Sequence, residues 1–353
     1  MPKIAADFLA IAKLNLRDTG LTTLDDRNLP RAVTLAKHMK TALRFISTLA
    51  FSAYVYGELA AHVYPFVLLP HVGVHLRVIA LTLFAFIHAG ASFGWKVGSL
   101  MFLTTAFVTW SFEQVGVATG AIYGHYHYSD MLGPKLGAIP ILIPLAWFMM
   151  IYPSYLVTNL VFDGRMFPES TDVRQILIRA LLAAMVMTAW DAVIDPAMSH
   201  AGFWVWEHGG SYLGVPRHNF AGWLATTFVV YLVFGFLHRW LKPFVNQRRD
   251  CFGLLPILAY AAVALVQVAN QNVTPTSIVA LFAMGFPVLL ALARWSQMSA
   301  KSIPKEVERV PTSLRRYLSH WGQAISLLRQ SSIHEGRKRF FSRSPRAVKT
   351  TLC

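Results

Sequence analysis

Residues 252–293 contain no charged side chain over 42 consecutive positions, and this run constrains the fold more than any other feature of the chain. A helix needs about 20 mostly apolar residues to cross a bilayer, where backbone polar groups must pair within the segment. The run is long enough for two spans, which Asn270-Gln271-Asn272 and Pro275 separate. Soluble domains carry about 25% charged residues, whereas this chain has 14% and a mean hydropathy of +0.46. The sequence therefore predicts a polytopic membrane protein.

Six further apolar stretches extend this prediction to about eight transmembrane helices, or seven if the first stretch is not a full span. They are residues 45–69, 77–95, 97–112, 136–162, 175–195 and 219–238. Glu58 interrupts the first stretch, where it either pairs with His62 or marks a misplaced boundary. We expect an all-α membrane helix bundle with a polar basic segment (1–44), a transmembrane catalytic domain (45–295) and a basic, mostly disordered C-terminal tail (296–353).

The net charge of +15 is concentrated in the two tails. Residues 1–44 carry eight Lys or Arg against four Asp or Glu, and residues 296–353 carry twelve against three. Basic tails beside membrane spans are typical of the cytoplasmic side, where they contact anionic lipids. We therefore expect both termini in the cytoplasm, and no nucleic-acid partner.

This topology brings acidic side chains to one face of the membrane. Glu113 ends the third predicted span, and Asp191 and Asp195 end the fifth on the same side, four residues apart and thus on one helix face. A carboxylate inside a bilayer is costly unless it is paired, hydrated or protonated, so these acids are candidates for function. Alternatively, they cap helices at the interface or pair with Arg217 or Lys135.

The loops that follow these two spans resemble each other. Glu113 precedes Tyr126 by 13 residues, and Asp191 precedes Trp204 by 13. The matching motifs are Tyr126-x-Tyr128 with Trp204-x-Trp206, and Leu132-Gly133-Pro134 with Leu213-Gly214-Val215-Pro216. This spacing indicates a span–loop–span duplication, and membrane proteins often place a site between such repeats.

The sequence contains too few candidate ligands for the metal sites of two classes of membrane enzyme. A membrane di-iron site needs several histidine clusters, and His71-xxx-His75 is the only such spacing. A prenyltransferase needs a second acidic cluster, but Asp163 and Asp172 lie in a loop predicted on the opposite face. We therefore predict no metal site. The tryptophans form an interface belt or offer ring faces to a cation, and both interpretations stay open.

Three segments carry a resemblance to a known family. They read EQVGVATGAIYGHYHYSDMLGPKLGAIPILIPLAWFMM (113–150), AWDAVIDPAM (189–198) and FWVWEHGGSYLGVPRHNFAGW (203–223). In this order they resemble the membrane carotenoid biosynthesis proteins, best known as 1,2-hydratases of gamma-carotene or lycopene ends. The resemblance covers roughly residues 45–295, and the family is distantly similar to small membrane lycopene cyclases.

The resemblance implies acid-catalysed addition of water to the terminal 1,2 double bond of an acyclic carotenoid end group, giving a tertiary 1-hydroxy carotenoid. A carboxylic acid protonates the less substituted carbon, water adds to the tertiary cation, and a base removes the extra proton. We expect no cofactor. The candidate catalytic residues are Asp191, Asp195 and Glu113, with either aspartate as the proton donor.

The resemblance also implies a substrate-binding set, in which His125, His127 or Asn219 would orient water. This set is Tyr123, His125, Tyr126, His127, Tyr128, Trp190, Trp204, Trp206 and Asn219. The expected partners are an acyclic or monocyclic carotenoid, water, anionic lipids and other enzymes of the pathway, in a bacterial inner membrane. An end-group cyclase and a non-catalytic carotenoid-binding protein remain as alternatives.

Overall fold

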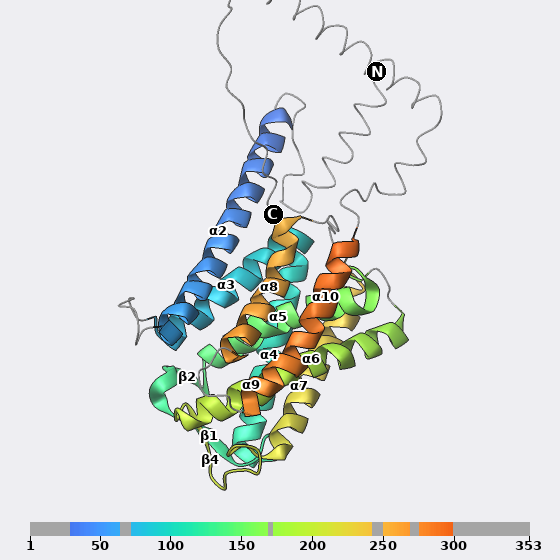
Figure 1. Cartoon of the computed structure of the whole chain (residues 1–353). Coiled ribbons are helices and arrows are strands. Elements are labelled where there is room, and N and C mark those ends of the chain that lie inside the picture. Colours follow the sequence, from blue (N-terminus) through green and yellow to red (C-terminus); the bar gives the residue numbers. More distant parts are fainter. Residues whose placement is uncertain (1–28, 64–71, 169–171, 242–249, 269–274, 299–353) are drawn as a thin grey trace, which may run out of the picture. The chain divides into compact units, whose positions relative to one another are not determined.

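The computed structural model describes residues 29–63, 72–168, 172–241, 250–268 and 275–298, with side chains from residue 38 onward. Most of these residues are helical (Figure 1). The helices are α2 (Leu29–Val63), α3 (Val74–Phe93), α4 (Trp95–Thr119), α5 (Leu142–Asp163), α6 (Val173–His200), α7 (Arg217–His238) and α8 (Cys251–Val268), followed by α9 (Pro275–Val279), the π-helix η2 (Ala280–Met284) and α10 (Gly285–Gln297). The predicted break at 270–272 and the tail beyond Met298 lie outside the described residues.

The helices follow the predicted apolar stretches in order, so the polytopic helical membrane fold is confirmed. In the part of the chain that the structure describes, six helices are long and apolar enough to cross a membrane. They are α3, α5, α6, α7, α8 and the continuous helix Pro275–Gln297. Helices α2 and α4 are also long enough to cross, at 35 and 25 residues, but neither is among these six. Helix α4 carries the charged residues Lys96 and Glu113. The chain is thus a multi-pass integral membrane protein.

Helix α5 packs against α3, α4, α6, α8 and α10 (Figure 1). Every side chain from Trp147 to Leu160 is buried, as expected of a helix that is apolar all round. Other helices expose large apolar side chains, such as Phe107 at 72% and Phe282 at 68%. Such exposure suits contact with lipid rather than water.

Several helix boundaries differ from the prediction. Helix α4 runs on to Thr119 rather than ending at residue 112, so Glu113 lies within it rather than at its end. Helix α2 begins at Leu29 rather than at residue 45, because hydropathy marks the apolar part of a helix and not its polar turns. Helix α6 runs on to His200 rather than ending at residue 195. Both aspartates therefore lie within a helix instead of at its end.

Helix α6 can continue past Pro196 because a loop side chain replaces a missing hydrogen bond. Proline has no N–H, so Pro196 leaves the carbonyl of Ala192 without its helical donor. The hydroxyl of Tyr212 donates to that carbonyl at 2.9 Å. A similar replacement occurs at Pro256 in α8. The carbonyl of Phe252, which Pro256 leaves without its helical donor, accepts a hydrogen bond from His88 Nε2 at 2.8 Å.

Two short strand pairs add a feature that the all-α prediction did not contain. Strand β1 (Tyr126–Tyr128) pairs antiparallel with β4 (Trp204–Trp206), and β2 (Lys135–Leu136) pairs with β3 (Ile139–Pro140). In the first pair Tyr126 lies opposite Trp206 and Tyr128 opposite Trp204. The two matching loop motifs of the sequence are therefore each other's partners, related by a local two-fold about His127 and Val205. We call this pair the β1–β4 ribbon.

A glycine lets α7 approach the loop that leads into this ribbon. A Cβ atom at Gly222 would overlap the carbonyl oxygen of Ile122 and the ring of Tyr123. We expect Gly222→Ala to lower the free energy of unfolding by about 1–3 kcal/mol, the usual cost of overpacking. Thermal unfolding in detergent measures this change.

The matched control is Gly285→Ala. A Cβ there meets its nearest atom at 3.8 Å, which is an ordinary contact. Because Ala favours a helix over Gly, this variant should unfold at the wild-type temperature or above it. A Gly222→Ala protein as stable as the control would contradict the close packing of α7 on the loop.

Candidate functional site

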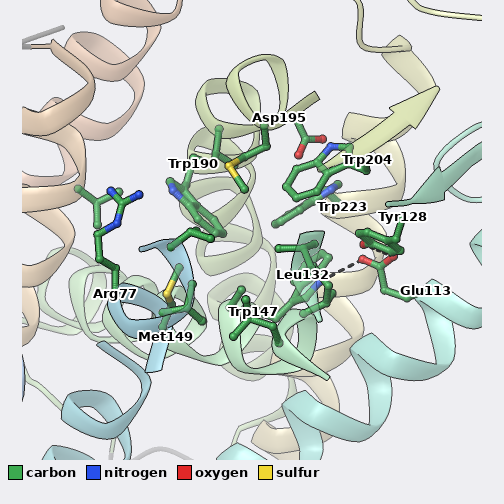
Figure 2. Close-up of a pocket in the computed structure, with 18 of the residues that line it drawn as sticks. Arg77, Glu113, Tyr128, Leu132, Trp147, Met149, Trp190, Asp195, Trp204 and Trp223 are labelled. Carbon is green, nitrogen blue, oxygen red and sulfur yellow. Dashed lines mark hydrogen bonds between the residues drawn. The ribbon is translucent and has the colours of Figure 1, made fainter. Parts of the chain in front are cut away.

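A cavity of ≈180 Å³ lies between the β1–β4 ribbon and the helices (Figure 2). It is lined by residues of α2 to α8 and of both strands of the ribbon. An apolar cavity of about 150 Å³ accommodates a molecule as large as benzene. This cavity can therefore hold a small group or one end of a long ligand, but not the whole of a long ligand.

Glu113 reaches this cavity from α4 and is surrounded by hydrogen-bond donors. Its side chain is buried, and its Oε2 accepts hydrogen bonds from the hydroxyls of Tyr126 and Tyr128, the latter at 2.9 Å. Trp147 Nε1 donates to Oε1 at 3.1 Å. A carboxylate offers about four acceptor positions, so three donors leave room for one more, such as a water molecule.

Strand geometry explains why both tyrosines reach Glu113. Alternate residues of a strand point to the same face, so Tyr126 and Tyr128 turn inward together. Burial raises the pKa of both phenols well above the ordinary value, and the nearby Glu113 raises it further. The two phenols therefore remain protonated, and each keeps the O–H that it donates to Glu113.

Asp191 and Asp195 form a buried pair one turn apart on α6. They are 0% and 2% exposed. Asn219 Nδ2, from the first turn of α7, donates to Asp195 Oδ2 at 2.5 Å and lies 3.3 Å from Asp191 Oδ2. Two carboxyl groups that share one buried site do not both ionise readily, because their like charges repel. The pair is therefore suited to hold a proton at the cavity.

Aromatic rings form the wall between these two acidic groups. Trp147 and Trp223 stack with ring centroids 3.7 Å apart, and Trp190 meets Trp223 edge-on at 5.9 Å. Trp204 packs against Tyr128 with centroids 6.0 Å apart. Figure 2 shows Trp204 and Trp223 beside Asp195, and Trp190 on the side of the pocket towards Arg77. Such ring faces attract positive charge.

The structure brings most of the predicted site residues to one cavity. Those that line it are Glu113, Tyr123, Tyr126, Tyr128, Trp190, Asp195, Trp204, Trp206 and Asn219. Asp191 does not line the cavity, but it lies one helical turn from Asp195 and contacts Asn219. His125 and His127 are exposed, because the alternation that turns the tyrosines inward turns these histidines outward.

Two cavity residues that the sequence left ambiguous are Trp147 and Trp223. Either tryptophan could equally have belonged to an interface belt. The internal repeat does not pair them, because Trp147 follows Pro134 by 13 positions and Trp223 follows Pro216 by seven. The signal that could have found them is that both lie within the segments that carry the family resemblance, 113–150 and 203–223.

Lys135, one of the two expected ionic partners of the acids, pairs instead with Asp130 at 2.8 Å. It also donates to the carbonyl of Tyr128 at 3.0 Å. This lysine holds the pKa of the Asp130 carboxyl below its usual value. Glu113 instead takes its hydrogen bonds from neutral phenol and indole groups. Among the described residues, no three His, Cys, Asp or Glu side chains gather closely enough to hold a metal ion.

Comparison with known proteins adds independent findings. A family model described as "Carotenoid biosynthesis protein" matches residues 72–289. A bisanhydrobacterioruberin hydratase of Haloarcula japonica is 37% identical over 146 residues, which are 40% of this chain. The match spans 46% of the length of that relative. No solved structure matches the chain.

Proposed function

Because the chain belongs to the carotenoid biosynthesis protein family, we propose that it is a hydratase that adds water to the terminal 1,2 double bond of an acyclic carotenoid. The product would be a tertiary 1-hydroxy carotenoid. One observation carries this proposal: Asp195, one of a buried pair of aspartates, and Glu113, a carboxylate with a vacant acceptor position, line one aromatic cavity. The name of the Haloarcula japonica relative, a hydratase, is consistent with it.

The first step would be proton transfer from Asp195, the member of the aspartate pair that lines the cavity. The proton goes to the less substituted carbon of the double bond, whose electron pair forms the new C–H bond. The other carbon becomes a tertiary cation. Asp191 acts as a positioning residue, because it does not line the cavity and shares the Asn219 amide with Asp195.

The second step would be attack by water on the cation, with Glu113 accepting the proton that the water releases. The three donors on Glu113 fix its orientation and leave one acceptor position for that water. The ring faces of Trp190 and Trp223 steady the cation without forming a bond to it. Release of the proton from Glu113 and reprotonation of Asp195 from the medium then restore the site.

The size of the cavity also fits a carotenoid end rather than a whole carotenoid. A space of ≈180 Å³ takes the last isoprene group, so the rest of the polyene would remain in the bilayer. We further propose that the membrane is a bacterial inner membrane. The basic tails would then lie on anionic lipid, near other enzymes of the pathway.

Expression in cells that accumulate an acyclic carotenoid tests the function. We expect pigments that carry a tertiary hydroxyl at the former double bond, and none in cells with an empty vector. Ring-bearing pigments would instead indicate a cyclase, in which an internal double bond captures the same cation. Pigment that co-purifies with the protein but keeps its mass would indicate a non-catalytic binding protein.

A further inference from the structure

The attacking water needs a second partner besides Glu113. A water molecule that attacks a cation through a lone pair has two hydrogens, and each needs an acceptor in a mostly apolar cavity, where an unpaired polar hydrogen is costly. Glu113 offers one acceptor position. His125 and His127, which the sequence suggested for this task, are exposed, and Asn219 donates to the aspartates. A second acceptor is therefore needed on the Glu113 side of the cavity.

Tyr123 lines the same cavity, and two helices hold its ring. A Cβ atom at Gly116 of α4 would lie 2.6 Å from Tyr123 Cδ2, and one at Gly222 of α7 would lie 2.7 Å from Cδ1. The lack of a side chain at both positions lets opposite edges of the ring pack directly against the two helices. Gly116 follows Glu113 by one turn, and Gly222 follows Asn219 by one turn. The ring therefore lies one helical turn from the carboxylate on one side and from the partner of the aspartates on the other.

The main chain of Tyr123 is anchored as well. Trp206 Nε1, from β4, donates to the Tyr123 carbonyl at 3.0 Å. The ring of Tyr126 meets that of Tyr123 edge-on, with centroids 6.0 Å apart. Side chain and main chain are thus fixed by separate contacts, which is the rigidity that positioning a small reactant requires.

The hydrogen bonds of Tyr123 fix the direction of its hydroxyl hydrogen. Tyr123 Oη lies 2.7 Å from Thr226 Oγ1, which donates its single hydrogen to the carbonyl of Gly222 at 2.8 Å. The phenol is therefore the donor in its bond with Thr226. Burial raises the pKa of this phenol well above its ordinary value, and the nearby Glu113 raises it further, so the group stays protonated. Its hydrogen is used on Thr226, and its oxygen has only lone pairs to offer the cavity.

We propose that the Tyr123 hydroxyl oxygen is a catalytic group that accepts one hydrogen of the attacking water while Glu113 accepts the other. The two acceptors aim a lone pair of the water at the cation, and that pair forms the C–O bond. The released proton passes to Glu113, because the phenol stays neutral. This inference rests on the proposed hydratase function and adds the residue that makes water capture faster than proton loss from the cation.

Water capture and proton loss compete for the same cation, so their ratio tests the inference. The purified full chain, in lipid nanodiscs, is given an acyclic carotenoid in D₂O. Mass spectrometry early in the reaction measures hydrated product and unhydrated carotenoid that carries deuterium. We expect Tyr123→Phe to lower the ratio of the first to the second by about three- to tenfold, the usual effect of one neutral hydrogen bond. The ratio does not depend on how much of each preparation is folded.

A second pair of variants tests the direction of the hydroxyl. Thr226→Val keeps the shape of the side chain but removes the acceptor of the phenol hydrogen, which can then turn toward the water and disturb its orientation. This variant should lower the ratio as Tyr123→Phe does, whereas Thr226→Ser, which keeps the hydroxyl, should retain the wild-type ratio. A Thr226→Val protein with the wild-type ratio would mean that Tyr123 contributes only its ring.

Tyr260→Phe is the matched control. It removes a buried hydroxyl that donates to the carbonyl of Val186 at 2.7 Å, and Tyr260 does not line this cavity. This variant should give the wild-type ratio. A Tyr123→Phe protein with that same ratio would overturn the inference and leave the hydratase intact. A wild type that forms no hydrated carotenoid would overturn the proposed function itself.

Discussion

Replacing Asp195 with Asn is expected to lower the rate of carotenoid hydration by about 10²–10⁴-fold, the usual contribution of a positioned general acid. Asn keeps the shape of the side chain and a hydrogen bond to Asn219 or Asp191, but it cannot deliver a proton. Asp195 is the aspartate of the pair that lines the cavity, so Asp191 cannot replace it at the substrate. Turnover of a purified sample in lipid nanodiscs gives the comparison.

Asp130→Asn is the matched control for this variant. Its carboxyl group lies on the loop between β1 and β2, pairs with Lys135 and is fully exposed. Removing it should leave turnover within about twofold of the wild type, since surface ion pairs contribute little. An Asp195→Asn protein that is folded and hydrates at the control rate would refute the role of Asp195.

Replacing Glu113 with Gln is the second large effect that we expect, with hydration lowered by about 10²–10³-fold. The amide cannot accept the proton of the attacking water, and its NH₂ group faces donors that need an acceptor. The proton donor remains in place, however. Protonation of the double bond should therefore continue, and the cation should lose either the added proton or a hydrogen of an adjacent carbon instead of capturing water.

Heavy water separates this behaviour from a simple loss of folding. In D₂O the cation carries deuterium at the protonated carbon, and the Glu113→Gln protein should return unhydrated carotenoid that keeps this label whenever the cation loses a protium from that carbon or from a neighbouring methyl group. The Asp195→Asn protein should return it unlabelled. Unlabelled carotenoid from Glu113→Gln, together with lost hydration, would mean that Glu113 acts before or during protonation rather than on the water.

Much of the fold follows from the sequence because the bilayer restricts the choice. Apolar stretches of about 20 residues form helices in a bilayer, because a helix pairs its own backbone polar groups. The predicted stretches and the observed helices follow the same order along the chain. The positions of helix ends depend on particular side chains instead. Helix α6 extends to His200 because Tyr212, distant in sequence, donates to the carbonyl that Pro196 frees.

The acidic residues of the candidate site could be predicted from the sequence, but their arrangement in space could not. Glu113, Asp191 and Asp195 stand out against a sparsely charged sequence. Which aspartate faces the cavity depends on the packing of α6 against α7, and hydropathy does not encode it. The alternation within β1 decides that Tyr126 and Tyr128 turn inward and His127 outward, and it appears only once the strand is recognised.

The ion pair between Glu58 and Arg77 shows another reason why contacts cannot be predicted from the sequence. Glu58 and Arg77 lie in separate helices, 19 positions apart, and no local spacing links them. The sequence offered His62 as a partner of Glu58 because it is one helical turn away. The contact with Arg77 depends on the crossing of α2 and α3 at Gly57, which is a property of tertiary packing.

The origin of the new oxygen tests the central claim most directly. The purified protein is given an acyclic carotenoid in water labelled with oxygen-18, and the product is analysed by mass spectrometry. Hydration through a protonated double bond predicts a product heavier by one labelled water, with the label in a tertiary hydroxyl. A product that carries unlabelled oxygen, or one with the mass of the substrate, would contradict the account.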